Sequence, residues 1–388
     1  MSDSPNYMNV LLIAGEKSGE EHAMTFVPEL KKMIPELSFW GVGGDELKLI
    51  GMELNYHLKD FSSWGISEVI SKIPFYLKAL SNIEQQARDK NCKVAILIDF
   101  QDFNMRLAKK LKQSGVKVLY YVAPQAWAWK EWRAYVLGDC VHTLFTIIKF
   151  EKDWFMRRGV PNVVSISHPL WNHYHKAICE KKNMLGLNHK PHEKFQREIN
   201  LLILPGSRNS EVTVLLDTFI KAAINLSKKH PVSIGIVKSP GVNRNYYSPY
   251  KKIITESWNS DDLEKGLSWA DLAIATSGTV TLTCALFEVP TVVNFNSSLF
   301  NTWFFYSFVN YKGFASLANI VHQEQVFPEL LGDECSEYSI EQKLLTWIKD
   351  KENYEKIKTK IAGTLALIDE SETNVSETMK DLIRESYV

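Results

Sequence analysis

Cysteine is scarce in this sequence: only five of its 388 residues are cysteines, and they lie far apart. No two of them form a CxxC pair, so neither a zinc site nor a disulfide framework is indicated, and a reducing compartment fits. A net charge is missing as well, because 45 basic residues balance 45 acidic ones. Since nucleic-acid-binding proteins usually carry a basic excess, we expect no nucleic-acid partner.

Long apolar runs are also missing. No window approaches the roughly 18 apolar residues that a membrane-spanning helix needs. The apolar run Met8–Ala14 is too short for a secretory signal, and no basic region precedes it. We therefore expect a cytoplasmic protein that is soluble or attached only to a membrane surface.

Short apolar runs alternate with helix-like segments along most of the chain. Continuous apolar strands separated by helices indicate parallel sheets covered on both faces. The predicted strands are Val10–Ala14, Ser38–Val42, Val94–Ile98, Val116–Val122, His142–Ile147, Leu201–Leu204, Ser233–Val237, Leu272–Ala275 and Thr291–Asn294, and the clearest helices are Glu21–Met33, Phe75–Arg88 and Asn104–Ser114. This pattern predicts an α/β fold of two Rossmann-like halves whose parallel sheets face each other across a ligand cleft.

A polar stretch rich in Lys, His and Asn separates the two alternations. We predict an N-terminal domain over residues 1–175, a linker over 176–200 and a C-terminal domain over 201–345. Residues 346–388 have a charged, helical pattern that predicts a closing segment, and packing against the N-terminal domain is one arrangement it allows.

The loop from Gly15 to Gly19 joins the first predicted strand to a helix. Its order fails the Walker pattern, in which Lys and Ser follow the second glycine, and it also fails GxGxxG. Glu16 and Glu20 stand at the helix start, where carboxylates repel a phosphate but suit a ligand with hydroxyl groups. A plain tight turn remains the alternative.

Polar side chains also follow the predicted strand Val94–Ile98. An N-cap explains Asp102 or Asn104, but it does not explain Asp99, which comes directly after the strand. A carboxylate at that tip could accept a proton from a substrate hydroxyl. From the pattern alone, a purely structural role for Asp99 stays open as the alternative.

Three tryptophans, Trp127, Trp129 and Trp132, crowd the segment after the next strand. They could stack on a sugar, line an acyl path or pack in the core. Two further aromatic stretches, residues 72–80 and 299–314, are typical either of a buried helix or of a patch that enters a membrane interface.

Two loops in the second half have the form of an anion site. Gly206 and Ser207 follow a strand and would leave backbone N–H groups free, and Arg208 offers a guanidinium to a pyrophosphate. Ser277–Thr279 follow a strand and precede a helix in the same way. A turn with a surface arginine would explain the first loop, but two such loops in one domain predict a nucleotide-diphosphate site.

Eight stretches, taken in order, resemble the lipid-A-disaccharide synthase family, glycosyltransferases of the two-Rossmann GT-B architecture. They are AGEKSGE (14–20), IDFQDFN (98–104), YYVAPQAWAWK (120–130), FEKDWFMRRGVP (150–161), SHPL (167–170), LPGSRNSEV (204–212), SGTVTL (277–282) and LANIV (317–321). The resemblance implies a hexosyltransferase that joins UDP-2,3-diacylglucosamine to 2,3-diacylglucosamine 1-phosphate. The products would be the β(1→6) lipid A disaccharide 1-phosphate and UDP, formed without a metal or another cofactor.

The resemblance also implies roles for residues at matching positions. Asp99 would be the catalytic base that takes the proton of the acceptor 6-hydroxyl. The donor site on the C-terminal domain would comprise Gly206, Ser207, Arg208, Glu211, Ser277, Gly278, Thr279, Thr281 and Asn319. The acceptor side on the N-terminal domain would comprise Gly15, Glu16, Ser18, Gly19, Asp102, Asn104, Gln125, Trp127 and Trp129.

The implied acylated glucosamine substrates are amphiphiles, so we expect peripheral attachment to the cytoplasmic surface of the inner membrane; whether the chain forms a homodimer is left open.

Some positions depart from the family pattern. Thr283 stands where Glu is usual, which leaves the ribose contact open, with Glu288 as a distant substitute. The other departures are Glu20, Gln101, Lys130 and Ala318, where Asp, Pro, Arg and Pro are usual. Another UDP-sugar enzyme of this architecture, such as a 2-epimerase or a different transferase, and a non-catalytic sugar-nucleotide-binding protein remain alternatives.

Overall fold

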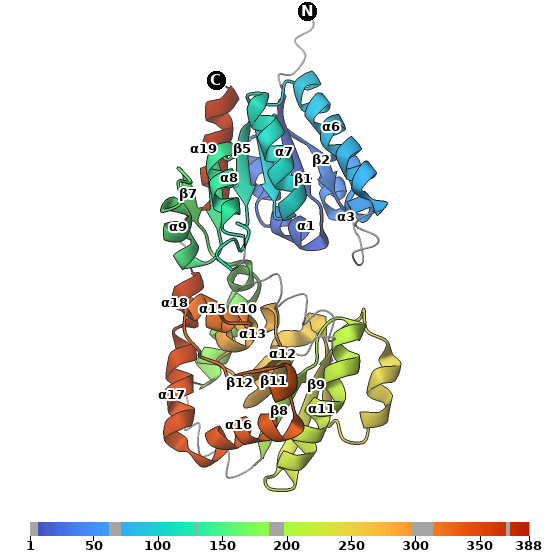
Figure 1. Cartoon of the computed structure of the whole chain (residues 1–388), viewed down its shortest axis with the longest axis vertical. Coiled ribbons are helices and arrows are strands. Elements are labelled where there is room, and N and C mark those ends of the chain that lie inside the picture. The colour runs from blue at the N-terminus through green and yellow to red at the C-terminus, as the bar shows by residue number, and fades with distance from the viewer. Residues whose placement is uncertain are drawn as a thin grey trace, which may run out of the picture. The chain divides into compact units, whose positions relative to one another are not determined.

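The computed structural model describes residues 7–61, 71–128, 130–185, 198–295, 313–369 and 373–387. The chain divides into two compact α/β units, residues 1–169 with 369–388 and residues 170–368 (Figure 1). Each unit is built on one parallel sheet with helices on its faces, so the predicted α/β class is confirmed.

The sheet of the first unit has seven strands in the order β3-β2-β1-β4-β5-β6-β7. The strands are β1 (Met8–Ala14), β2 (Leu37–Gly43), β3 (Glu53–His57), β4 (Val94–Ile98), β5 (Lys117–Tyr121), β6 (Thr143–Thr146) and β7 (Val163–Ser165). The central strands β1, β4 and β5 pair in parallel with no shift of register, and Ala14 lies opposite Ile98. Their carboxyl ends therefore meet at one edge of the sheet, where open α/β sheets bind ligands.

The helices of this unit are α1 (Lys17–Met24), α2 (Val27–Met33), α3 (Asp45–Leu49), α4 (Leu58–Phe61), α6 (Ile73–Asp89), α7 (Gln101–Gln113), α8 (Trp132–Cys140), α9 (Lys149–Met156) and α19 (Val375–Tyr387). The single helix predicted over Glu21–Met33 is wrong, because the chain forms two helices there. The break precedes Pro28, which lacks an N–H and is tolerated only in the first turn of the second helix.

Two apolar layers cover the two faces of the first sheet. Helices α6, α7 and α8 cover one face, and α1, α2 and α19 contribute to the other. Helix α19 comes from the far end of the chain, and its Met379 and Ile383 are fully buried in the layer that contains Val10 and Leu12. The Tyr387 hydroxyl lies 3.2 Å from the amide of Lys93, which donates to it.

The second unit has six strands in the order β10-β9-β8-β11-β12-β13. They are β8 (Ile199–Leu204), β9 (Val232–Lys238), β10 (Glu256–Asn259), β11 (Leu272–Thr276), β12 (Thr291–Phe295) and β13 (Glu329–Leu331). Its α-helices are α10 (Pro169–Leu185), α11 (Asn209–Ser227), α12 (Leu263–Trp269), α13 (Thr279–Leu286), α15 (Leu317–His322), α16 (Glu337–Lys349), α17 (Lys351–Ala362) and α18 (Thr364–Ile368).

The edge strands were missed by the sequence pattern. None of β3, β7, β10 and β13 is the fully buried apolar run by which the central strands were recognised, and β3 and β10 have no buried residue at all. A strand that is only partly buried need not consist of consecutive apolar residues, so its sequence pattern resembles that of a loop.

The predicted linker over residues 176–200 does not match the structure at either end. Helix α10 continues to Leu185 and β8 begins at Ile199, while residues 186–197 lie outside the described part of the chain. The side chain of Lys181 anchors α10 to the second unit, because its Nζ donates to the carbonyls of Leu267 and Phe287 at 2.9 and 2.7 Å. The predicted closing segment 346–388 is divided between the units, with α17 and α18 in the second and α19 in the first.

Within the described ranges, no helix has both the length and the apolar character required to span a bilayer.

Candidate active site

The turn after β4 has an unusual backbone conformation. Asp99 and Phe100 follow the strand directly, and both have positive φ angles, 45° and 43°. Residues other than glycine rarely adopt this left-handed backbone region, because it costs about 1–3 kcal/mol of conformational energy per residue. Two such residues in succession indicate that the surrounding structure holds this turn in place, which is a frequent property of active sites.

Three hydrogen bonds hold the strained turn. Asn104 Nδ2 donates to the carbonyl of Asp99 at 2.8 Å and to that of Ile98 at 3.1 Å. The Tyr120 hydroxyl also donates to the Asp99 carbonyl, at 2.8 Å. Asn104 is fully buried. The expectation that it faces the acceptor is therefore corrected: its amide positions the Asp99 turn.

Gly15 and Gly19 make room for this turn. A Cβ on Gly15 would come within 2.8 Å of the Phe100 ring, so the close approach of the two loops requires glycine. A Cβ on Gly19 would lie in ordinary contact with Ala14 and Ile98. These two glycines serve packing between neighbouring strand ends.

A pocket of about 770 Å³ opens beside Asp99. Its lining residues are Glu16, Phe61, Ile73, Tyr76, Leu77, Leu80, Asp99, Phe100, Gln101, Asp102, Phe103 and Arg106. The predicted residues Glu16, Asp99 and Asp102 are thus brought together, while the apolar wall was not predicted as part of a site. Four of its rings, those of Phe61, Tyr76, Phe100 and Phe103, pack against one another, with centroids between 5.1 and 6.4 Å apart.

The Asp99 carboxyl is held in a poorly solvated place. Burial, and then the nearby negative charge of Glu16, raise its pKa to about 6. A carboxylate with a pKa in this range is a better proton acceptor near neutral pH than an ordinary aspartate. Perturbation by burial together with a charged neighbour, inside a pocket, is typical of catalytic groups.

Asp102 differs from Asp99 in its surroundings. Its carboxylate accepts a hydrogen bond from the buried Arg133 at 2.9 Å, and the other side of that guanidinium contacts Gln101. Arg133 is itself buried, and through these two contacts it fixes the start of α7.

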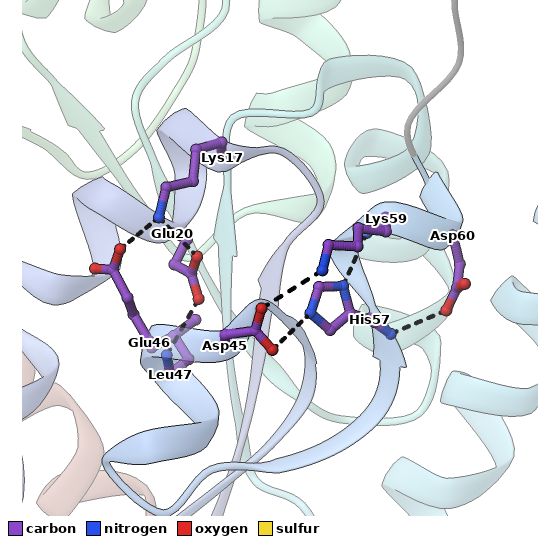
Figure 2. Close-up of polar contacts among 8 residues, drawn as sticks. All are labelled: Lys17, Glu20, Asp45, Glu46, Leu47, His57, Lys59 and Asp60. Atoms are coloured by element: carbon purple, nitrogen blue, oxygen red, sulfur yellow. Dashed lines mark hydrogen bonds and ion pairs between the residues drawn. The ribbon is translucent and has the colours of Figure 1, made fainter.

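The loop after β1 is fastened by ion pairs (Figure 2). Lys17 Nζ lies 2.5 Å from Glu46 and 3.1 Å from Glu20, so it is not directed at a phosphate. The buried Glu20 carboxylate also accepts the amide of Leu47 at 3.1 Å, which ties α1 to α3. The ligand role suggested for Glu20 is thus replaced by a structural one, while Glu16 and Ser18 remain exposed.

Trp127 and Trp132 do not line this pocket. Trp127 Nε1 donates to the buried carboxylate of Glu151 at 2.9 Å, and its ring packs against Phe150. Burial raises the pKa of Glu151 to about 7. Gln125 is exposed, and Trp129 lies outside the described residues, as does most of the aromatic stretch 299–314.

A second pocket, of about 340 Å³, lies at the carboxyl ends of β8 and β11 in the second unit. It brings together both predicted anion loops, Gly206–Arg208 and Ser277–Thr279, together with Glu211. The lining residues that sequence reasoning missed include Val237, Ser239, Ser260 and Leu263, which lack a recognisable motif.

The backbone N–H groups of the first loop are not free, which corrects the prediction. The amides of Ser207 and Arg208 donate to one oxygen of the Glu211 carboxylate at 3.0 and 3.2 Å. The other oxygen lies 3.0 Å from the Arg208 guanidinium. Glu211 thus occupies, with its own negative charge, the donors that were expected to bind a pyrophosphate. Gly206, with φ of 112°, allows this close approach, because a Cβ there would overlap the carboxylate.

The second loop offers backbone rather than side-chain donors. The first amides of helix α13, at Thr279 and Val280, have no acceptor within the helix and lie at its positive end. The Ser277 hydroxyl instead donates to the carbonyl of Ala315 at 2.6 Å, and that of Thr281 donates to Gly278 at 2.7 Å. These two hydroxyls shape the loop.

Asn319 is fully buried and holds the segment before β13. Its Nδ2 donates to Glu329 and Phe327 at 2.7 and 2.8 Å, and its Oδ1 accepts the amides of Val326 and Phe327. Because its amide is used within the protein, we correct the expected direct contact with the donor to a positioning role.

Thr283 and Glu288, the two positions weighed for a ribose contact, do not line the pocket. Thr283 is buried, and Glu288 lies 3.6 Å from Lys358. In the described residues, no group of three or more His, Cys, Asp or Glu side chains has an arrangement that could hold a metal ion.

The comparisons with known proteins agree with this geometry. A family model described as lipid-A-disaccharide synthetase matches residues 10–383. A lipid-A-disaccharide synthase of Myxococcus xanthus is 32% identical over 358 residues, covering 88% of this chain and 89% of the relative. Lipid-A-disaccharide synthase 1 of Legionella pneumophila is 31% identical over 338 residues, covering 86% of each.

Solved structures with a similar fold are distant in sequence. UDP-GlcNAc 2-epimerase from Neisseria meningitidis, bound to UDP-GlcNAc, has a TM-score of 0.56 at 12% identity and covers 98% of this chain and 99% of its own. The S. aureus MnaA-UDP co-structure has a TM-score of 0.57 at 13% identity, covering 98% of this chain and 96% of its own. These likenesses concern the fold alone and confirm the predicted GT-B class.

The hydrogen bonds at Asn104 lead to a prediction about stability. Asn104→Ala removes the buried donor from two carbonyls, so we expect the free energy of unfolding to fall by about 1–3 kcal/mol. The measurement is chemical denaturation of purified protein. Asn82→Ala is the control, because Asn82 lies on the exposed side of α6 and should change stability by at most about 0.5 kcal/mol. Equal losses in the two variants would contradict the role given to Asn104.

Proposed function

This chain belongs to the lipid-A-disaccharide synthetase family, and we propose that it joins UDP-2,3-diacylglucosamine to 2,3-diacylglucosamine 1-phosphate. The products are the β(1→6) disaccharide 1-phosphate and UDP. The observation that carries the proposal is the strained, poorly solvated Asp99 in a pocket with an apolar wall, in a chain whose family match runs from residue 10 to 383. The match favours this transferase over a 2-epimerase or a binding protein.

The first unit suits an acylated acceptor. Its pocket combines a carboxylate base with aromatic and aliphatic walls, so a sugar hydroxyl can approach Asp99 while acyl chains contact the apolar side. In the reaction, the acceptor 6-oxygen forms a bond to the anomeric carbon of the donor. Its proton passes to Asp99, and the bond between the anomeric carbon and the diphosphate oxygen breaks.

The second unit suits the leaving nucleotide diphosphate. Arg208 and the first turn of α13 present positive charge and N–H donors to the same pocket. We propose that they stabilise the negative charge of departing UDP without a resident metal ion. For this to happen the diphosphate must displace the Glu211 carboxylate from the amides of Ser207 and Arg208.

We also propose peripheral attachment to a membrane surface. Ile73 and Leu77 lie one turn apart on α6, are 47% and 53% exposed, and line the rim of the acceptor pocket. Lys72 and Lys78 flank them. An exposed apolar patch with basic neighbours is typical of a surface that enters an anionic interface.

Asp99→Asn should lower kcat for disaccharide formation by about 10²- to 10⁴-fold, because the base is lost. The affinity for UDP should be unchanged. In the wild-type protein, activity should fall as pH drops through about 6, since protonated Asp99 cannot accept the proton. The assay mixes both substrates and detects disaccharide and UDP by mass. Asp89→Asn, an exposed aspartate of the same unit, is the control, and near-wild-type turnover of Asp99→Asn would exclude Asp99 as the base.

Two substitutions at the start of α11, one at its N-cap Arg208 and one in its first turn, should shift UDP affinity in opposite directions. Arg208→Ala removes a charged partner and should weaken binding by about 1.5–3 kcal/mol, or roughly 10- to 150-fold. Glu211→Gln keeps an oxygen that can cap the helix but removes the competing charge, so UDP should bind more tightly. Asp217→Asn on the same helix is the control for loss of a carboxylate. Titration calorimetry measures all three, and weaker binding by Glu211→Gln would contradict displacement.

For the membrane surface, the double variant Ile73→Ser and Leu77→Ser should bind anionic vesicles at least tenfold more weakly. Burying each apolar side chain contributes about 1.5 kcal/mol or more. Leu49→Ser, which alters an exposed leucine of α3 outside the pocket, is the control. Vesicle co-sedimentation measures the effect. Wild-type protein that partitions equally with and without vesicles would refute the attachment.

A further inference from the structure

The acceptor pocket of the first unit is rich in negative charge. Three carboxylates, those of Glu16, Asp99 and Asp102, line it. An acceptor that carries a phosphate would be repelled here unless a positive charge balanced the carboxylates. The pocket must therefore contain a cation for that phosphate, or the phosphate must stay outside.

Arg106 lines the pocket and Arg133 contacts two of its lining residues, and the two arginines differ in their availability to a ligand. Arg133 is buried, with its guanidinium on Asp102 and Gln101, so it neutralises a carboxylate of the protein itself. Arg106 is exposed and is the one cationic residue among the described residues that line the pocket. Within the part of the chain that the structure describes, Arg106 has no hydrogen bond or ion pair, so its five N–H donors are open to a ligand in the pocket.

Arg106 lies on α7, and both it and Asp99 line the pocket. It follows Phe103 by one helical turn, and residues three and four apart share a face of a helix. Phe103 belongs to the aromatic wall, so that wall leads toward the guanidinium. From the start of α7, next to Asp99, the helix rises roughly 7–8 Å to Arg106.

We propose that Arg106 binds the phosphate of the acceptor and thereby makes this site select an anionic amphiphile over a neutral one. This inference rests on the proposed function. In the acceptor, the 6-hydroxyl and the 1-phosphate are separate groups carried on either side of the ring oxygen, through C5 and C1. With the hydroxyl at Asp99, the phosphate lies toward Arg106, whose planar guanidinium can bind two phosphate oxygens together. The acyl chains then lie along the apolar wall.

The test compares two lipids and measures binding without any donor. The probes are 2,3-diacylglucosamine 1-phosphate and the same lipid with a methyl group in place of the phosphate, both in neutral detergent micelles. Arg106→Met should raise the dissociation constant of the phosphorylated lipid 10- to 100-fold and change that of the methyl lipid less than threefold. Arg106→Lys keeps the positive charge but loses the planar guanidinium that binds two oxygens together. Its dissociation constant for the phosphorylated lipid should therefore lie between those of wild type and Arg106→Met.

Lys109→Met is the matched control, because Lys109 is an exposed cation of the same helix that does not line the pocket. It should bind both lipids as the wild type does. An equal loss for both lipids in Arg106→Met would overturn the proposal, since it would mean a structural role. Unchanged binding of the phosphorylated lipid would overturn it too. A protein that binds the lipid with this selectivity but forms no disaccharide would instead refute the proposed function.

Discussion

The left-handed turn at Asp99 and Phe100 is the constraint on which the first unit depends. A carboxylate at the end of a central strand would normally point where the strand directs it. Here two residues with positive φ change the direction of the chain, and the energy this costs is offset by the hydrogen bonds of Asn104 and Tyr120. Gly15 is required because the Phe100 ring lies against it. The turn therefore affects the neighbouring loop, the position of the Phe100 ring in the pocket wall and the solvation of the Asp99 carboxyl.

The charges in the pocket of the second unit are arranged differently from those in the first. The proposed ligand of the second unit's pocket is an anion, and in the structure a carboxylate of the protein occupies the donors of the first loop. Glu211 keeps those N–H groups satisfied and holds Arg208 in position. Because the Glu211 carboxylate accepts hydrogen bonds from these amides, they do not need water molecules as partners. Under the proposed function, a nucleotide would have to compete with that carboxylate, which would lower its affinity and favour release of the product.

Particular residues show how far sequence reasoning went in the site. Asp99 stood out because it follows a strand directly and no cap requires it. Gly206–Arg208 stood out because glycine and arginine after a strand suit a phosphate. Asn104 follows the same strand as Asp99, and Asn319 was named through the family resemblance, yet the NH₂ groups of both side chains are bound inside the protein. A sequence gives the chemistry of a side chain but not its partners, so buried positioning residues and ligand contacts look alike.

The sequence by itself determined the two α/β halves, the central strands and the family, because continuous apolar runs and ordered motifs are local properties of the chain. It also placed polar groups at the strand ends, since parallel strands bring those ends together. Tertiary structure alone decided the short edge strands and the return of α19 to the first unit. It also decided that Arg133 is buried and paired whereas Arg106 is exposed. Each of these depends on contacts between segments far apart in sequence. Such contacts decide which charges are buried and paired, and so which of them remain for a ligand.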